Sequence, residues 1–172
     1  MHTETFAMKK RNALIVIAFI LLAGLQLSTS ARATPAPAFT LPEIHSMESL
    51  SLADYQGKVI YLDFWASWCG PCRKSLPLMN EVYKRLEDQG FIVIAINLDE
   101  NRELGLKFLE SQPLDYPIVF DKTKSVPGKY QLEAMPSAYL IDKKGTIRAI
   151  HKGFKEKDLS KIETQITFLL DE

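Results

Sequence analysis

Two stretches of the chain are continuously apolar and have the length of strands that are buried on both faces. One extends from Val59 to Ala66 and contains a single acid, Asp63, and the other extends from Phe91 to Ile96. Such runs are typical of a parallel sheet that is covered by helices. Between them, apolar residues recur at helical spacing, namely Leu76, Met79, Val82, Tyr83 and Leu86. The pattern predicts a strand–helix–strand unit with a right-handed crossover.

The rest of the chain continues the alternation of short strands and helices. The segment 34–42 is rich in proline and alanine and predicts a linker into a first short strand, and 50–52 predicts a second one. Further strands are predicted over 117–120, 137–141 and 147–150. Helical segments are predicted over 101–111, for about one turn within 126–132, and at the C-terminal end, where Leu159, Ile162, Ile166 and Leu169 share a face.

The first 33 residues have the three parts of a secretory signal peptide. A basic cluster, Lys9 to Arg11, precedes an apolar run from Ala13 to Leu25, and the small-residue site Ala31-Arg32-Ala33 follows. The apolar run, about 13–15 residues, is shorter than the roughly 20 that span a bilayer. We therefore expect a signal peptide over 1–33 and one mature domain over 34–172, with an uncleaved membrane anchor as the alternative. Met8, directly before the basic cluster, is an alternative start to Met1.

Composition and charge narrow the functional classes. Of 172 residues, 47% are apolar and 24% are charged, with 21 basic and 21 acidic side chains. This is the composition of a globular protein, and it lacks the basic excess that a nucleic-acid binder needs. Without residues 1–33 the chain keeps 17 basic and 20 acidic residues. We expect an exported, mildly acidic monomer in an oxidising compartment, where paired cysteines form disulfides.

The only two cysteines lie three positions apart in Trp68-Cys69-Gly70-Pro71-Cys72, where the first buried strand passes into the first helix. A cysteine at a helix N-terminus is favoured as a thiolate by the free N–H groups and the helix dipole. A second cysteine one turn later can close a disulfide with it. We therefore expect Cys69 to attack a substrate disulfide and Cys72 to resolve the mixed disulfide.

Two other interpretations of the pair are weaker. A structural zinc site needs about four ligands, and His2, His45 and His151 show no paired ligand spacing. A purely structural disulfide would gain little by closing so short a loop. A copper-binding assembly module that uses Cys69, Cys72 and His151 remains a rival function from a different class.

The sequence pattern alone does not decide the roles of two further candidate site residues, Asp63 and Pro136. A carboxylate within an apolar strand is costly unless it is neutral or paired. Asp63 is either a buried acid that moves the proton of Cys72, or a structural acid that is satisfied or reaches solvent. Met135-Pro136 directly precedes a predicted strand, where proline is either a cis turn or an ordinary strand start.

The segment from Asp63 to Cys72, Asp-Phe-Trp-Ala-Ser-Trp-Cys-Gly-Pro-Cys, resembles the active-site segment of thioredoxins. The expected export, two short leading strands and the stretch 101–112 resemble the TlpA/ResA-like branch of extracytoplasmic thiol–disulfide oxidoreductases. The resemblance extends from about Ala38 to Leu170, and Pro77 and Met135-Pro136 also match. It implies an α/β thioredoxin-like fold, in which helices flank a central mixed sheet with a short N-terminal β extension and an inserted helical stretch.

The resemblance also implies roles for residues around the cysteines. Pro136 would be cis and pack beside the disulfide, and the backbone at Met135 would bind the substrate peptide through strand-like hydrogen bonds. Trp68, Gly70 and Pro71 would complete the substrate-binding surface. Asp63 would act as the proton relay, and no cofactor is implied beyond the redox-active Cys69–Cys72 disulfide.

The chain departs from the family pattern at several positions. Many cytochrome-maturation members of the branch have Glu where this chain has Ser75, and many have Asn where it has Asp63. Thioredoxins often place a lysine near the buried acid, and we expect Ile96 at that position. Met135 replaces a more usual Thr or Val. The site therefore resembles a thioredoxin-type proton relay on an exported scaffold, and a role in haem attachment is less favoured.

The Gly-Pro dipeptide between the cysteines resembles that of reductants. We therefore expect a protein-disulfide reductase, which in an oxidising compartment needs a membrane electron donor of DsbD or CcdA type. Candidate substrates are a cytochrome haem motif, a copper-site cysteine pair or a sulfenylated cysteine. A disulfide oxidase or isomerase is the alternative within the same class.

Overall fold

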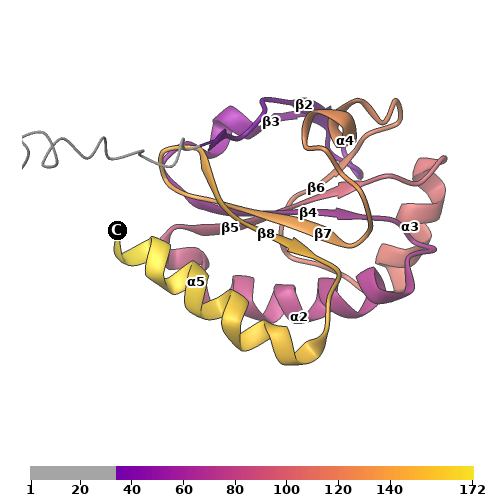
Figure 1. Ribbon diagram of the computed structural model, residues 1–172. Coiled ribbons are helices and arrows are strands. Elements are labelled where there is room, and N and C mark those ends of the chain that lie inside the picture. The colour runs from indigo at the N-terminus through magenta and orange to yellow at the C-terminus, as the bar shows by residue number, and fades with distance from the viewer. Residues whose placement is uncertain (1–33) are drawn as a thin grey trace, which may run out of the picture. The chain divides into compact units, whose positions relative to one another are not determined.

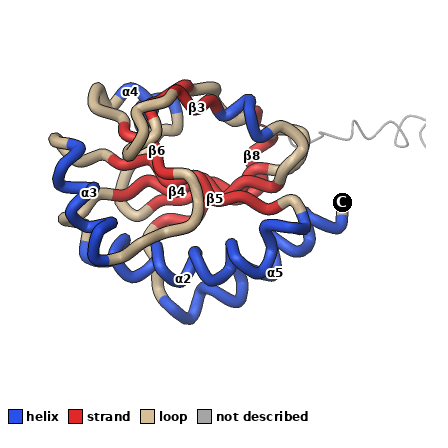
Figure 2. Tube along the Cα trace, turned by 180° about the vertical axis from the view of Figure 1, so that it is seen from behind, coloured by secondary structure: helices blue, strands red, loops and turns tan. Residues whose placement is uncertain are grey.

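The computed structural model describes residues 34–172 and has a six-stranded mixed sheet at its centre (Figure 1). The strands lie in the order β1-β8-β7-β4-β5-β6, and a separate two-stranded sheet pairs β2 with β3. Helices α2 and α5 cover one face of the central sheet, and α4 lies over the other together with β2 and β3 (Figures 1 and 2). This confirms the predicted mixed sheet flanked by helices.

The parallel half of the sheet positions the cysteine pair. Strand β4 (Val59–Trp65) pairs in parallel with β5 (Phe91–Asn97), and β5 pairs in parallel with β6 (Ile118–Phe120). Helix α2 (Gly70–Leu86) connects β4 to β5, followed by the short 3₁₀ helix η2 (Glu87–Gln89). Gly90, with a φ of 93°, then provides the left-handed turn into β5. The predicted strand–helix–strand unit is therefore present.

The antiparallel half closes the sheet on the other side of β4. Strand β7 (Ser137–Ile141) pairs with β4, and β8 (Thr146–Lys152) pairs with β7. Strand β1 (Thr34–Pro35) pairs with β8 at Ile147 and Thr146. The sequence analysis assigned this first segment to a linker. A strand of two residues is too short to show the alternation of apolar and polar side chains that indicates a strand.

The remaining elements follow the prediction with small shifts of their ends. The leading strands are β2 (Thr40–Pro42) and β3 (Ser49–Ser51), and the 3₁₀ helix η1 (Leu52–Tyr55) follows them. Helix α3 (Arg102–Ser111) forms the inserted helical stretch, and α4 (Ser125–Lys129) is the short turn before β7. After η3 (Glu156–Asp158), helix α5 (Leu159–Asp171) ends the chain.

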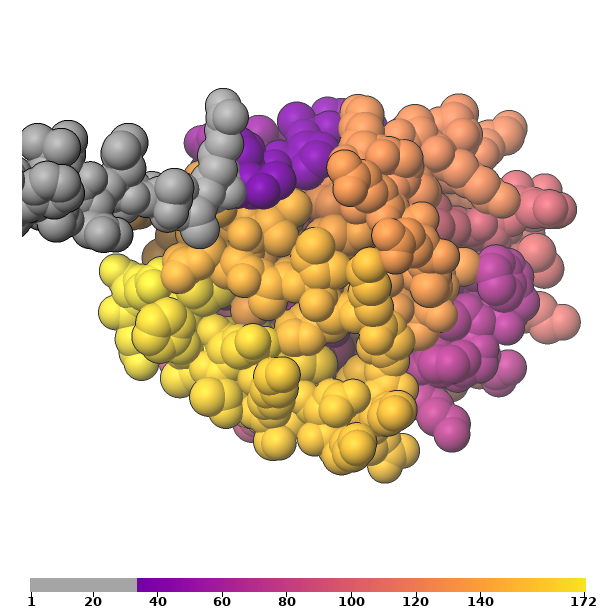
Figure 3. Space-filling view, viewed as in Figure 1, coloured from indigo at the N-terminus to yellow at the C-terminus, as the bar shows by residue number. Residues whose placement is uncertain are grey.

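The sheet separates two hydrophobic cores. The core on the side of α2 and α5 contains both cysteines, Leu76 and Met79 from α2, and Ile162 and Ile166 from α5. The core on the other side contains Phe64, Ile94 and Ile96 and extends to α4 and the leading strands. Figure 3 shows α5 in yellow beside the orange segment of β7 and β8 on the surface of one face.

The expected signal peptide over residues 1–33, and the alternative membrane anchor, lie outside the described residues. Among residues 34–172, no helix combines the length and the hydrophobicity required to cross a membrane.

Candidate active site

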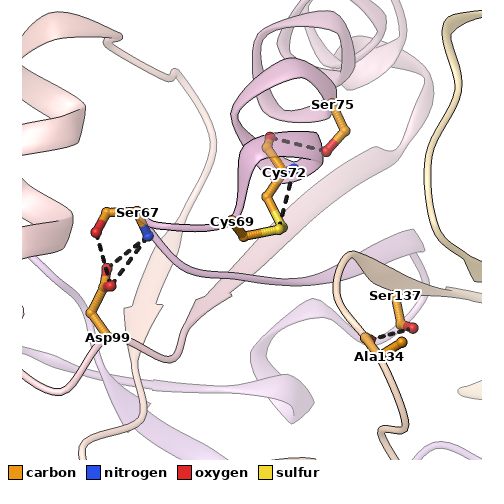
Figure 4. The surroundings of a disulfide bond; sticks show 7 residues. All are labelled: Ser67, Cys69, Cys72, Ser75, Asp99, Ala134 and Ser137. Carbon is orange, nitrogen blue, oxygen red and sulfur yellow. Dashed lines mark hydrogen bonds between the residues drawn. A yellow bond between two sulfur atoms is a disulfide. The ribbon is translucent and has the colours of Figure 1, made fainter.

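The two cysteines form a disulfide at the first turn of α2 (Figure 4). Cys69 is the N-cap residue of this helix, and its Sγ accepts a hydrogen bond of 3.3 Å from the backbone N–H of Cys72. Pro71 follows at the start of the helix, where its missing N–H costs nothing. When the pair is reduced, the same helix N-terminus favours a thiolate at Cys69.

The surroundings of the two sulfur atoms are asymmetric. Cys72 is completely buried within the core under α2, whereas Cys69 keeps 5% exposure and is followed by the exposed residues Gly70 and Pro71. Trp68 is 66% exposed, an unusual state for the largest apolar side chain. A substrate disulfide can therefore approach from the side of Cys69, across a surface made by Trp68 and the first residues of α2.

The loop before β7 lies in the surroundings of the disulfide (Figure 4). The Met135-Pro136 peptide bond is cis, as the resemblance implied, and Pro136 is buried. Met135 is half-buried and packs against the core that holds the cysteines. Within the loop, the Ser137 hydroxyl donates to the Ala134 carbonyl at 2.8 Å, and the Gly153 N–H donates to the Pro136 carbonyl (Figure 4).

Asp63 lies at the middle of the sheet, with 2% exposure. Its register partners are Ala95 on β5 and Ala138 on β7, and both belong to the same core as the cysteines. Burial raises the pKa of Asp63 from 3.8 to about 8, opposed in part by a hydrogen bond from the Phe64 backbone. Its Oδ1 is buried without a hydrogen-bond partner. Asp63 is therefore neither a solvent-reaching acid nor a fully satisfied structural one.

The residue next to Asp63 on β5 differs from the expectation. We expected Ile96 at this position, but the register places Ala95 beside Asp63, while Ile96 pairs with Phe64 and packs in the opposite core. A shift of one residue moves a strand side chain to the other face of the sheet. The consequence for the chemistry is unchanged, because neither residue brings a cation to the acid.

Ser75 occupies the position one turn after Cys72 but cannot replace a titrating group. It is buried, and its hydroxyl donates to the Cys72 carbonyl at 3.1 Å. This is a hydrogen bond within the helix, and it gives the hydroxyl a backbone partner.

His151 is not brought to the cysteine pair. Its ring stacks on Tyr61 of β4 with a centroid separation of 6.1 Å, and burial lowers its pKa. Across residues 34–172, no three side chains of His, Cys, Asp or Glu come close enough together to hold a metal ion.

Sequence analysis missed a polar cluster that lies directly before Cys69. The carboxylate of Asp99, in the loop after β5, accepts hydrogen bonds from the backbone and the hydroxyl of Ser67 (Figure 4). A signal was available, because the carboxyl ends of parallel strands meet at one edge of a sheet and gather functional groups there. Asn97 and Asp99 stand at the end of a buried strand and beside the strand that leads to Cys69.

Comparison with known proteins places this site in a family. Residues 33–150 match the AhpC/TSA family. The thiol-disulfide oxidoreductase ResA of Geobacillus thermodenitrificans is 35% identical, over 88% of this chain and 94% of the relative. ResA of Bacillus subtilis is 31% identical, over 69% of this chain and 65% of the relative.

Solved structures show the same architecture. A protein from Chlorobium tepidum, assigned as a thiol:disulfide interchange protein DsbE, superposes with a TM-score of 0.77 at 40% identity and covers 80% of this chain and 96% of its own. The thioredoxin domain of a thiol-disulfide oxidoreductase from Bacteroides vulgatus superposes with a TM-score of 0.71 at 29% identity, over 82% and 99% of the two chains. The predicted thioredoxin-like fold is confirmed.

Proposed function

Because this chain belongs to the AhpC/TSA family and is a thiol–disulfide oxidoreductase of the ResA-like branch, we propose that it reduces substrate protein disulfides outside the cytoplasm. One observation carries the chemistry: the Cys69–Cys72 disulfide lies at the N-terminus of α2, with the Cys69 Sγ on the backbone N–H of Cys72. This geometry supports a nucleophilic role for the sulfur at the more exposed position, which is Cys69.

In the first step the Cys69 thiolate attacks one sulfur of the substrate disulfide. A mixed disulfide forms between Cys69 and the substrate, and the other substrate sulfur leaves as a thiolate. The substrate peptide docks between Trp68 and the loop at Met135 and Pro136. Met135 offers its backbone for strand-like pairing, and its flexible side chain adapts to different sequences.

In the second step Cys72 resolves the mixed disulfide. The Cys72 thiol loses its proton to the ionised fraction of Asp63, and the resulting thiolate attacks the Cys69 sulfur. The substrate leaves with its second sulfur reduced, and the Cys69–Cys72 disulfide forms again. The raised pKa of Asp63, about 8, leaves an ionised fraction near neutral pH that can accept this proton.

The direction and the location complete the proposal. The Gly70-Pro71 dipeptide supports reduction, and the pattern of residues 1–33 supports export with cleavage after Ala33. Each turnover oxidises the pair and thus requires two electrons from outside the protein. A membrane dithiol donor of DsbD or CcdA type would supply them. The substrates would be cysteine pairs of proteins under assembly, such as cytochrome or copper-site proteins.

Three measurements on the protein and its two cysteine variants test the proposal. In the reduced protein, iodoacetamide should alkylate Cys69 first, as read by peptide mass spectrometry, and Cys72→Ser should accumulate mixed disulfides with substrate proteins. Cys69→Ser should abolish reduction of a peptide disulfide. Preferential alkylation of Cys72 would refute the nucleophile assignment.

The reduction potential of the pair decides the direction. A value near −270 mV would support a reductase, whereas one near −120 mV would identify an oxidase. An intermediate value together with rearrangement of scrambled disulfides would identify an isomerase.

A further inference from the structure

A buried carboxylate that the exchange chemistry does not use lies directly beside the loop that carries Cys69. Asp99 has no exposed surface. Its Oδ1 accepts from the Ser67 hydroxyl at 2.9 Å, and its Oδ2 accepts from the Asn97 side-chain amide at 2.8 Å. The Ser67 backbone N–H lies within 3.2 Å of both oxygens. The side chain is thus fully engaged, and three of the four hydrogen bonds that it accepts come from Ser67, 32 residues away.

That partner belongs to the turn that delivers the nucleophile. The Cys69 N–H donates to the Ala66 carbonyl at 3.0 Å, which closes a four-residue turn from Ala66 to Cys69. Ser67 is the second residue of this turn, and the turn itself leaves the Ser67 N–H unused. Asp99 binds that free group, so it fixes the turn from outside. Figure 4 shows Ser67 and Asp99 on one side of the disulfide, and Ala134 and Ser137 on the other.

Asp99 is itself held in place by Asn97. Asn97 ends β5 opposite Trp65, and its Oδ1 accepts from the Asp99 N–H. Helix α3 packs directly on Asn97: a Cβ at Gly105 would lie 3.1 Å from the Asn97 Nδ2 and 2.9 Å from the Ile44 Cδ1. Helix α3 thus packs closely on Asn97, the residue whose side chain donates to Asp99.

We propose that Asp99 is a positioning residue for thiol–disulfide exchange: through Ser67 it fixes the turn that sets Cys69 at the start of α2. Loss of the anchor would let the turn relax and would misplace the Cys69 sulfur relative to both the substrate disulfide and the Cys72 N–H. The proposal rests on the proposed nucleophilic role of Cys69, and it adds a residue outside the Cys-x-x-Cys segment.

Two variants of Asp99 separate anchoring from charge. Asp99→Asn and Asp99→Ala both remove the negative charge, but only asparagine keeps an oxygen that can accept from the Ser67 N–H. The Ser67 hydroxyl can rotate and accept from the new amide. The difference in rate constant between the two variants therefore reports the effect of the hydrogen bond from the Ser67 N–H. The measured quantity is the second-order rate constant of the reduced protein with an oxidised peptide that carries one disulfide, recorded as a pH profile.

Asp121 provides the matched control. It also has no exposed surface, and its carboxylate also accepts backbone bonds, from Ser125 at 3.1 Å and Val126 at 2.8 Å. These bonds hold the start of α4 instead of the active-site turn. Asp121→Ala and Asp121→Asn should thus lower thermal stability, but their rate constants should agree with each other within about twofold, because neither touches the turn.

We expect the plateau rate constant at high pH, where Cys69 is fully ionised, to be about tenfold lower for Asp99→Ala than for Asp99→Asn. Equal plateaus for these two variants would overturn the proposal, and so would an equal tenfold gap at Asp121. If Asp99→Ala does not fold, Ser67→Ala removes only the hydroxyl bond and should slow the plateau by about threefold. An unchanged plateau in Ser67→Ala would then overturn it.

Mass spectrometry separates this proposal from the proposed function. Alkylation of the wild type at Cys72 would refute the nucleophile assignment and the role of Asp99 together. Alkylation at Cys69, with equal plateaus for Asp99→Ala and Asp99→Asn, would refute only the role of Asp99.

Discussion

Asp63 and Asp99 are both sealed from solvent, with 2% and 0% exposure, but their surroundings differ in the donors they offer. Asp63 lies between Ala95 and Ala138, and one of its oxygens has no partner. Asp99 lies at the end of the sheet, where Ser67 and Asn97 satisfy both oxygens. The same side chain thus keeps an oxygen without a partner in one place and has both oxygens hydrogen-bonded in the other.

The difference shows that the burial of an acid does not by itself indicate its role. Desolvation disfavours the charged carboxylate, and only hydrogen bonds or cations offset it. At Asp63 desolvation dominates and raises the pKa to about 8, where a proton can be exchanged. At Asp99 both oxygens accept hydrogen bonds from Ser67 and Asn97, and the side chain can then hold a loop. The four predictions below test this contrast, from the largest expected effect to the smallest.

Asp63→Asn should slow the resolving step by about a hundredfold, since the proton acceptor for Cys72 is lost. The first attack by Cys69 should change much less. Stopped-flow mixing of the reduced protein with a fluorescent peptide disulfide resolves the two steps as formation and decay of the mixed disulfide. Unchanged decay and an unchanged pH dependence would show that Asp63 is not the relay and that water accepts the proton.

Asp99→Ala should destabilise the protein by about 3 kcal/mol, because the Ser67 N–H and the Asn97 amide lose their acceptor in a buried place. Urea unfolding of the oxidised protein at pH 7 measures the change. A loss below about 0.5 kcal/mol, the size of an ordinary surface substitution, would contradict the view that Asp99 is structural.

The stability of the protein should depend on pH through the titration of Asp63. Its folded pKa of about 8 lies above the ordinary value of 3.8, so the folded state binds one more proton than the unfolded state between these values. Stability must then fall as the pH rises through this window, by at most about 1.4 kcal/mol per pH unit, and level off above pH 8.

Asp63→Asn should remove this slope and leave a more stable protein at pH 8, because no buried carboxylate has to be ionised. The comparison requires urea unfolding of the wild type and the variant at several pH values between 5 and 9. If the free energy of unfolding changes with pH in the same way in both proteins, the raised pKa of Asp63 is contradicted.

Ser75→Ala should have the smallest effect, since its hydroxyl only donates to the Cys72 carbonyl within α2. We expect a loss of about 0.5–1 kcal/mol in stability and less than a twofold change in either step of exchange. A larger kinetic effect would mean that Ser75 takes part in the proton path together with Asp63.

Sequence reasoning predicted those parts of the fold whose signals are local. Strands β4 and β5 stand out as uninterrupted apolar runs, and α2 follows from its spacing and from the cysteine pair at its start. The two-residue strand β1 could not be predicted in this way, because its only structural role is to pair with β8 more than a hundred residues later.

Sequence reasoning found those residues of the proposed site that are neighbours in the chain or that the family resemblance implied. Cys69, Cys72 and Asp63 belong to one segment, and the family resemblance added the cis bond at Pro136. Asp99 was missed because its partners, Ser67 and Asn97, become its neighbours only through the pairing of β4 with β5. Ile96 was assigned the place of Ala95 because a register uncertain by one residue exchanges the two faces of a strand.

The two tryptophans of the chain should allow substrate binding to be followed by fluorescence. Trp68 is 66% exposed beside Cys69, whereas Trp65 is fully buried and packs on Phe108 with ring centroids 5.3 Å apart. Emission from an indole in water lies at longer wavelength than emission from an indole in an apolar core. Docking of a substrate over Trp68 should therefore shift only the long-wavelength component, and Trp65 provides an internal reference within the same spectrum.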